Sequence, residues 1–228
     1  MKTTGGGDEA KRRAGESAAA LVESGTTVGL GTGSTAAHAI RRLGERVSDG
    51  LDVVGVPTSF QSRERAREAG IPLRGLDEVD GIDVAIDGAD QVADFDLIKG
   101  GGAAHAREKV VDSFADRFVV VADPSKEVEL LSRPVPVEVL PDAHPVVAHA
   151  VEDAGGAPTL RVAERKDGPV VTDNGNLVLD CGFGEISDPG ALARTLAATP
   201  GVVEHGLFVG VADEVHVGTA DGVTVHER

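Results

Sequence analysis

The sequence predicts an α/β protein with a doubly wound, mostly parallel (Rossmann-like) sheet and a second, smaller ferredoxin-like α+β domain. Two observations favour this fold class. Over the first 131 residues, short apolar runs alternate with segments of helical periodicity, as strands and helices do in a parallel sheet. After residue 131 the order of expected elements changes to βαββαβ, which is typical of a small ferredoxin-like unit. With 228 residues and 41% hydrophobic residues, the chain is long enough to bury such cores.

The elements of the first part follow from apolar periodicity and from the turn residues between them. Ala14 and Ala18 recur on one side of the first helical segment. In the last helical segment, Val110, Val111 and Phe114 form an expected apolar edge. The expected helices cover residues 9–24, 34–47, 59–70 and 101–115, and the expected strands cover residues 26–31, 51–57, 83–87 and 117–123.

The elements of the second part end with a return to the first sheet. Asn174-Gly175 is a hairpin turn between apolar runs, and Asp188-Pro189 begins a helix. The tail is rich in β-forming residues and is expected to rejoin the first sheet. The predicted domains are therefore residues 1–131 plus 206–228, which form the Rossmann-like domain, and residues 132–205, which form the ferredoxin-like domain. Strands are expected at 135–140 and 159–164, and a helix at 144–154.

Composition excludes several classes of function. The net charge is −16 with a pI near 4.7, so we expect no binding to nucleic acid, whose phosphates such a surface repels. No apolar run is long enough to span a membrane. The N-terminal segment lacks the apolar core of a signal peptide, and a single cysteine makes no internal disulfide, so we expect a cytoplasmic protein. The acidic, lysine-poor composition indicates either adaptation to high salt or an ordinary acidic protein.

Four apolar strands of the first part each run into a polar, turn-forming segment. These segments are TGST, PTSF, DGAD and DPSK. Because the carboxyl ends of parallel strands share one edge of the sheet, where such folds bind ligands, we expect the four segments to converge in space.

The first of these segments has the features of an anion site. Backbone amides and hydroxyls of residues 32–35 precede a helix that Ser34 or Thr35 is expected to cap, and helix N-termini attract anions. The dinucleotide fingerprint is missing because Ser34 stands where glycine is required. A P-loop would need a lysine next to the pair of hydroxyl residues, and Ala36 stands there instead. A tight strand-to-helix turn without a ligand explains the same residues, and both interpretations remain open.

The third segment, DGAD, and the residues that follow it bring together acidic side chains, a lysine and a run of glycines. Asp87 and Asp90 follow a buried strand, where a carboxylate is costly unless it is used or hydrogen-bonded. Lys99 precedes three glycines, which permit a close approach of backbone to ligand. Glu108 lies about 100° from the apolar centre of its helix, a position that fits either a cleft or a solvated face. Asp90 could equally cap a helix.

Lysine is sparse in this chain, and its placement favours a phosphorylated small molecule. Lys11, Lys99, Lys109 and Lys126 are four of only six lysines, and they lie next to the polar segments or strand ends. The seven histidines and Cys181 show no metal-ligand spacing, so we expect no metal site.

With these motifs in view, the chain resembles the type A ribose-5-phosphate isomerase family nearly from end to end. The matching segments include VGLGTGSTAAHAI, DGADQV, LIKGGGAAHAREK, ADPSK and VTDNGNLVLD. The resemblance implies interconversion of D-ribose 5-phosphate and D-ribulose 5-phosphate in the non-oxidative pentose phosphate pathway, by a homodimer or homotetramer, with Glu108 as the proton-transferring base. The substrate contacts that it implies are Lys11, Thr32, Gly33, Ser34, Thr35, Asp87, Gly88, Ala89, Asp90, Lys99, Gly100, Gly101, Gly102 and Lys126.

A cis-enediolate mechanism requires no metal or organic cofactor and gives each of the catalytic residues a role. Lys99 and the glycine amides would stabilise the developing oxyanion. Asp87 would exchange a proton with O1 or the ring oxygen, and Asp90 would orient hydroxyls. Two other functions use the same fold: a phosphosugar sensor without catalysis, and a CoA transferase in which Glu108 is a nucleophile.

Overall fold

The computed structural model describes residues 7–165 and 167–228 of the chain. Residues 1–6, which include Lys2 and begin the segment considered for a signal peptide, lie outside the described residues. Lys166 lies outside them as well. No helix within the described ranges is long and apolar enough to cross a membrane.

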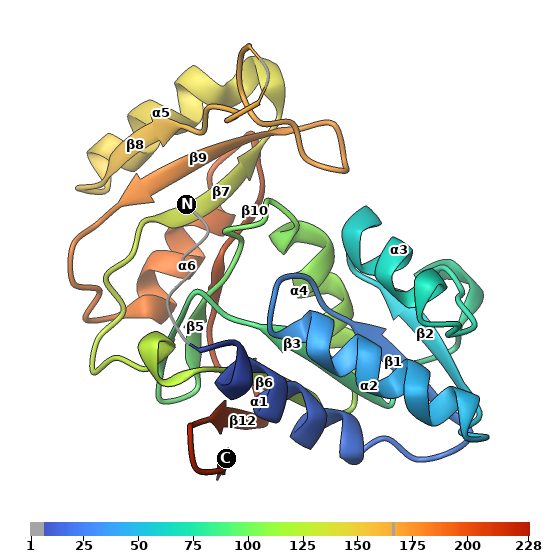
Figure 1. The fold of residues 1–228 in the computed structure, drawn as a ribbon. Helices are drawn as coiled ribbons and strands as arrows, with labels where there is room; N and C mark the ends of the chain where they lie inside the picture. Colours follow the sequence, from blue (N-terminus) through green and yellow to red (C-terminus); the bar gives the residue numbers. More distant parts are fainter. Residues whose placement is uncertain (1–6, 166) are drawn as a thin grey trace.

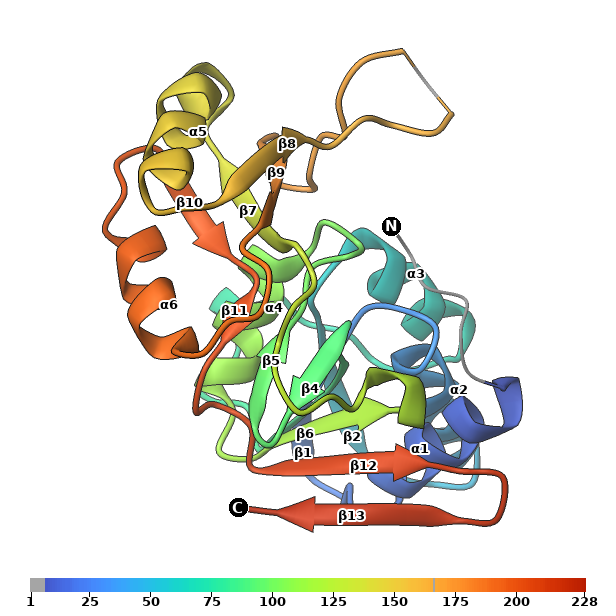
Figure 2. The ribbon, with the colours of Figure 1, turned by 90° about the vertical axis from the view of Figure 1, so that its left-hand side faces the viewer.

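The larger sheet has six strands in the order β13-β12-β6-β3-β1-β2 (Figures 1 and 2). Its five strands from β12 to β2 are parallel, and β13 pairs antiparallel with β12 at one edge. The prediction of a mostly parallel sheet that the tail rejoins is therefore confirmed. The strands are β1 (Thr26–Leu30), β2 (Val53–Pro57), β3 (Val84–Gly88), β6 (Phe118–Ala122), β12 (Glu214–Gly218) and β13 (Val223–Glu227).

Helices cover both faces of this sheet. The apolar residues of α1, α2 and α3 share one core with β1, β2, β3 and β6. Helix α4 lies on the opposite face, where Val111 packs with Val56 and Ile82. Short 3-10 turns at Leu76–Glu78 (η1) and Pro124–Lys126 (η2) complete this part. The helices are α1 (Asp8–Ala20), α2 (Ala36–Ser48), α3 (Phe60–Glu68) and α4 (His105–Phe114).

Helix α4 differs from its prediction in two ways. It begins at His105 rather than at residue 101, because the glycine run forms a turn in which Gly100 has φ +102° and Ala103 has φ +60°. Its expected apolar edge is also wrong in part, since Val110 and Phe114 are about half exposed. The buried side of the helix instead carries polar residues that belong to the site described below.

The second part is the ferredoxin-like unit. Its four-stranded antiparallel sheet has the order β10-β7-β9-β8, and its elements follow as βαββαβ. Apolar side chains of both helices pack in one core with this sheet. The boundaries predicted for the two domains remain a prediction. The elements are β7 (Val135–Val139), η3 (Pro141–Ala143), α5 (His144–Asp153), β8 (Ala157–Leu160), β9 (Leu177–Gly182), α6 (Pro189–Ala197) and β10 (Val202–His205).

A third sheet, which the sequence analysis did not predict, joins the two parts. Its strands β4 (Gln91–Ala93), β5 (Asp96–Ile98) and β11 (Leu207–Phe208) are antiparallel. The backbone N–H of Lys99, just after β5, donates to the carbonyl of Gly206 at 2.8 Å. The sheet therefore fixes the position from which Lys99 enters the site.

Candidate active site

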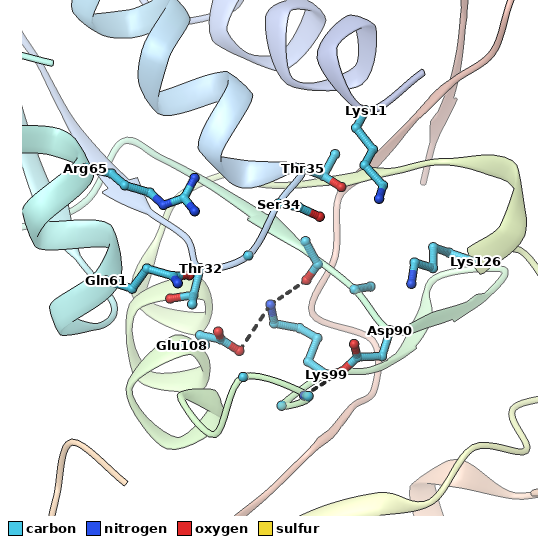
Figure 3. Close-up of a pocket in the computed structure, with 16 residues that line it drawn as sticks. Lys11, Thr32, Ser34, Thr35, Gln61, Arg65, Asp90, Lys99, Glu108 and Lys126 are labelled. Carbon is cyan, nitrogen blue, oxygen red and sulfur yellow. Dashed lines mark hydrogen bonds and ion pairs between the residues drawn. The ribbon is translucent and has the colours of Figure 1, made fainter. Parts of the chain in front are cut away.

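The polar ends of four parallel strands meet around one cavity of about 230 Å³ (Figure 3). Residues after β1, β2, β3 and β6 all contribute to it, as the convergence argument predicts. Of the residues predicted for the site, all but Asp87 line the cavity. The lining residues are Lys11, Thr32, Gly33, Ser34, Thr35, Gln61, Arg65, Gly88, Ala89, Asp90, Lys99, Gly100, Gly101, Gly102, Glu108 and Lys126.

One end of the cavity is suited to an anion. Gly33, at φ +112°, turns the chain into the N-terminus of α2, where the helix dipole is positive. Thr35 is the N-cap residue of α2, but its side chain makes no capping hydrogen bond. The expectation that its hydroxyl caps this helix is therefore not met. Lys11 and Lys126 are both buried at this end (Figure 3). Burial lowers the pKa of Lys126, with the charge of Asp90 opposing the shift.

The other end contains a lysine surrounded by carboxylates. Lys99 Nζ lies 2.9 Å from Asp87 Oδ2, 3.4 Å from Glu108 Oε2 and 3.8 Å from Asp112 Oδ2. It also donates to the carbonyl of Gly88 at 2.6 Å. None of the four charged side chains is more than 5% exposed, so their charges interact with little screening by water.

Burial and mutual repulsion shift the pKa values of these groups. Burial raises the pKa of Glu108 to about 8, although the charge of Lys99 acts in the opposite direction. Burial likewise raises the pKa of Asp87 and, more strongly, that of Asp112. Burial favours neutral lysine, but the surrounding carboxylates outweigh it and raise the pKa of Lys99. Lys99 therefore stays cationic, and Glu108 can gain or lose a proton near neutral pH.

Asp87 lies behind Lys99 and does not line the cavity. Its Oδ1 accepts hydrogen bonds from the backbone N–H groups of Thr32 at 2.9 Å and Gly88 at 2.7 Å. Its Oδ2 faces Lys99. The proton exchange with the sugar ring that we predicted for Asp87 does not fit this position, because protein groups surround both oxygens. The carboxylate instead holds Lys99 and the first turn in place.

Asp90 lines the cavity and organises the glycine run. Its Oδ2 accepts a hydrogen bond from the N–H of Gly101 at 2.7 Å, so Asp90 does not use this oxygen to cap a helix. A Cβ atom at Gly101 would lie 2.7 Å from Asp90 Oδ1, and one at Gly100 would lie 2.7 Å from His105 Nδ1. Glycine is therefore required at both positions. Because the Gly101 amide already donates to Asp90, that N–H group is not available to an oxyanion, whereas Lys99, Gly100 and Gly102 also line the cavity.

Comparison with known proteins agrees with this geometry. The family described as ribose 5-phosphate isomerase A (phosphoriboisomerase A) matches residues 54–222. The chain belongs to this family. A ribose-5-phosphate isomerase A of Halorubrum lacusprofundi is 70% identical over 240 residues, which cover the whole of both chains. That of Haloarcula marismortui is 73% identical over 221 residues, covering 97% of this chain and 96% of the relative.

Solved structures of the ribose 5-phosphate isomerase A family share the fold. The structure of the enzyme from Methanocaldococcus jannaschii is 45% identical, with a TM-score of 0.93 over 97% of this chain and 99% of that one. A D-ribose-5-phosphate isomerase in complex with phospho-erythronic acid is 44% identical, with a TM-score of 0.94 and the same coverage.

Sequence reasoning missed three residues of this site. Asp112 follows Glu108 by one helical turn, and the spacing i, i+4 would have placed both carboxylates on one side of the helix. Gln61 and Arg65 have the same spacing on α3, and both face the cavity (Figure 3). Within residues 7–165 and 167–228, no group of three histidine, cysteine or acidic side chains could hold a metal ion.

Proposed function

We propose that the protein interconverts D-ribose 5-phosphate and D-ribulose 5-phosphate, with Glu108 as the base. The observation that supports this proposal is the position of Glu108. Its buried carboxylate lines the same cavity as the Thr32–Thr35 turn, and Lys99 lies 3.4 Å from it. A single cavity thus offers an anion site, a base and a cation, which are the groups that an aldose–ketose isomerisation of a sugar phosphate requires.

The phosphate would bind at the cationic end of the cavity. Ser34 and Thr35 offer hydroxyls and helix amides there, and Lys11 and Lys126 offer ammonium groups. Binding the non-reacting phosphate provides energy that holds the sugar chain in one orientation. Its C1 and C2 atoms then lie at the end formed by Glu108 and Lys99.

The proton transfer needs one carboxylate. Glu108 removes the proton from C2 of the open-chain aldose, and the C2–H electron pair forms the C1–C2 double bond of a cis-enediolate. The negative charge that develops on O1 is stabilised by Lys99. Glu108 then returns its proton to C1 while the proton of the C2 hydroxyl passes to O1, so that the C2 carbonyl forms and the base is restored. Asp90, on the cavity wall, would orient the hydroxyl groups.

The two other candidate functions lack support from the comparisons. The similar proteins named above are isomerases, and none is a sensor or a CoA transferase. We also propose a cytoplasmic location and a homodimer or homotetramer. The resemblance to the family supports the assembly, and the single cysteine, buried in β9, supports the location.

Proton exchange with solvent tests the proposal most directly. In D2O, wild-type protein supplied with ribose 5-phosphate should produce ribulose 5-phosphate that carries deuterium at C1, as observed by NMR. Glu108→Gln should lower kcat by about 10³ or more with little change in KM, because the base alone is lost. Binding of the sugar phosphate without conversion or exchange would instead indicate a sensor.

A further inference from the structure

Helix α3 forms one side of the active-site cavity and is tied directly to the anion-binding turn. It carries Gln61 and Arg65 on successive turns, and Ser59 is its N-cap residue. The hydroxyl of Thr32 donates to Ser59 Oγ at 2.7 Å. A displacement of the first turn of α3 would therefore move both Gln61 and Thr32.

The ferredoxin-like unit contacts this first turn through Asp173. The backbone N–H of Phe60 donates to Asp173 Oδ2 at 2.7 Å, although 113 residues separate the two. Phe60 is the first residue of α3, and its N–H has no acceptor within the helix. A carboxylate at this position also interacts favourably with the helix dipole. In Figure 1 the orange loop before β9 extends from the small sheet toward α3.

A buried glutamate holds the turn that carries Asp173. Glu138 of β7 is fully buried, and its Oε1 accepts hydrogen bonds from Thr172 Oγ1 at 2.9 Å, Asn174 Nδ2 at 3.0 Å and Asn176 Nδ2 at 2.8 Å. All three donors lie in the turn formed by residues 172–176. Burying a carboxylate is costly unless it is hydrogen-bonded, so Glu138 and this turn depend on each other.

The 172–176 turn also closes a space next to the active site. A second cavity of about 90 Å³ lies between the turn, α3 and the glycine run, and it shares three lining residues with the first cavity. Asp173 contributes to its wall from the ferredoxin-like side. The residues that line it are Thr32, Ser59, Gln61, Gly102, Ala103, Ala104 and Asp173.

We propose that Asp173 is a positioning residue of the active site. Held by Glu138, it fixes the first turn of α3 and, through that turn, the side chains of Gln61 and Thr32 on the cavity wall. The ferredoxin-like unit thereby contributes to substrate binding without a side chain in the active-site cavity. This inference rests on the isomerase activity proposed above.

The test combines steady-state kinetics with hydrogen–deuterium exchange. Asp173→Ala should speed amide exchange in the peptide that spans α3 and raise KM by about 3- to 10-fold, the range expected for a lost helix-capping contact. The acidic limb of the pH profile should stay unchanged, because Glu108 keeps its surroundings. Asp173→Asn keeps an acceptor oxygen and should restore most of the affinity. Thr172→Val, which removes one hydrogen bond to Glu138, should shift KM in the same direction.

Asp188 provides a matched control, because its Oδ1 accepts from the N–H of Ala191 at 2.8 Å at the start of α6, away from the cavity. Asp188→Ala should speed exchange in α6 alone and leave KM unchanged. In a Gln61→Ala background, Asp173→Ala should raise KM by a smaller factor than in the wild type, because only the route through Thr32 remains. An equal KM increase in both backgrounds, or a KM within twofold of wild type, would overturn the proposal. Failure of wild-type protein to convert ribose 5-phosphate would refute the activity instead, and exchange in α3 would still test the contact.

Discussion

Replacing Lys99 with methionine should destabilise the protein in a manner that depends on pH. The ammonium lies 2.9 Å from the carboxylate of Asp87 and 3.4 Å from that of Glu108. Glu108, with a pKa of about 8, is mostly protonated at pH 7, so the attraction counted here is the one to Asp87, which is worth about 6 kcal/mol at an effective dielectric constant of about 20. The methionine side chain has a similar length and no charge, so it removes this attraction and leaves the Asp87 carboxylate buried.

The carboxylates can limit this loss by taking up a proton. A carboxyl group with the ordinary aspartate pKa of 3.8 is protonated at pH 7 at a cost of about 4 kcal/mol, since each pH unit corresponds to about 1.4 kcal/mol. This is less than the lost attraction, so the variant should bind an extra proton when folded. Its carboxyl pKa is then raised above the unfolded value, and stability falls as pH rises. We expect a loss of about 4 kcal/mol at pH 7 and about 2 kcal/mol at pH 5.

Urea unfolding followed by far-UV circular dichroism measures this difference, because the chain has no Trp or Tyr for fluorescence. Lys11→Met is the control, since Lys11 lines the same cavity outside the group of three carboxylates. An equal loss at both pH values, or a loss below about 1 kcal/mol, would contradict the electrostatic argument. In the variant kcat should also fall by about 10²–10³. A change confined to KM would assign Lys99 to binding alone.

Three further predictions follow from the charges of the site and of the surface. Burial raises the pKa of Glu108 to about 8, and its carboxylate form is the base. We therefore expect kcat/KM to fall about tenfold per pH unit below pH 8, and a flat profile from pH 6 to 9 would contradict the role of Glu108 as the base. Lys126→Ala should raise KM by about 10- to 100-fold with kcat nearly unchanged, and an effect on kcat alone would remove Lys126 from phosphate binding. If the charge of −16 reflects adaptation to high salt, the free energy of unfolding should rise by more than about 1 kcal/mol between 0.1 M and 2 M KCl, since salt screens surface repulsion; indifference to KCl refutes the idea.

The parallel sheet and the position of the site could be predicted because each rests on local signals. An apolar run that ends in a polar turn indicates a buried strand, and the parallel arrangement places all such turns at one edge. Thr32 to Thr35, Gly88 to Asp90 and Lys126 reach the cavity for this reason alone. No side-chain detail was needed for this inference.

The contacts between distant segments could not be predicted in the same way. Strands β4, β5 and β11 are two or three residues long, too short for a pattern of alternation, and β11 pairs with β5 across about a hundred residues. The contact between Asp173 and Phe60 likewise has no local signal. Such contacts depend on how the two parts of the chain pack, which periodicity does not describe.

The orientation of α4 shows what a hydrophobic pattern leaves out. By apolarity its buried side should have carried Val110 and Phe114, yet Glu108 and Asp112 are buried instead. Two ionised acids at i, i+4 repel each other, and on a buried side this repulsion is relieved by a nearby cation together with the uptake of a proton. Lys99 supplies that cation, at 3.4 Å from one carboxylate and 3.8 Å from the other. The chain has six lysines, and one of them, Lys99, stands just before a glycine run. The next helix carries two acids one turn apart, Glu108 and Asp112. Together, these features indicate a buried charge cluster. Electrostatic pairing, rather than hydrophobicity, therefore decides which side of this helix faces the protein.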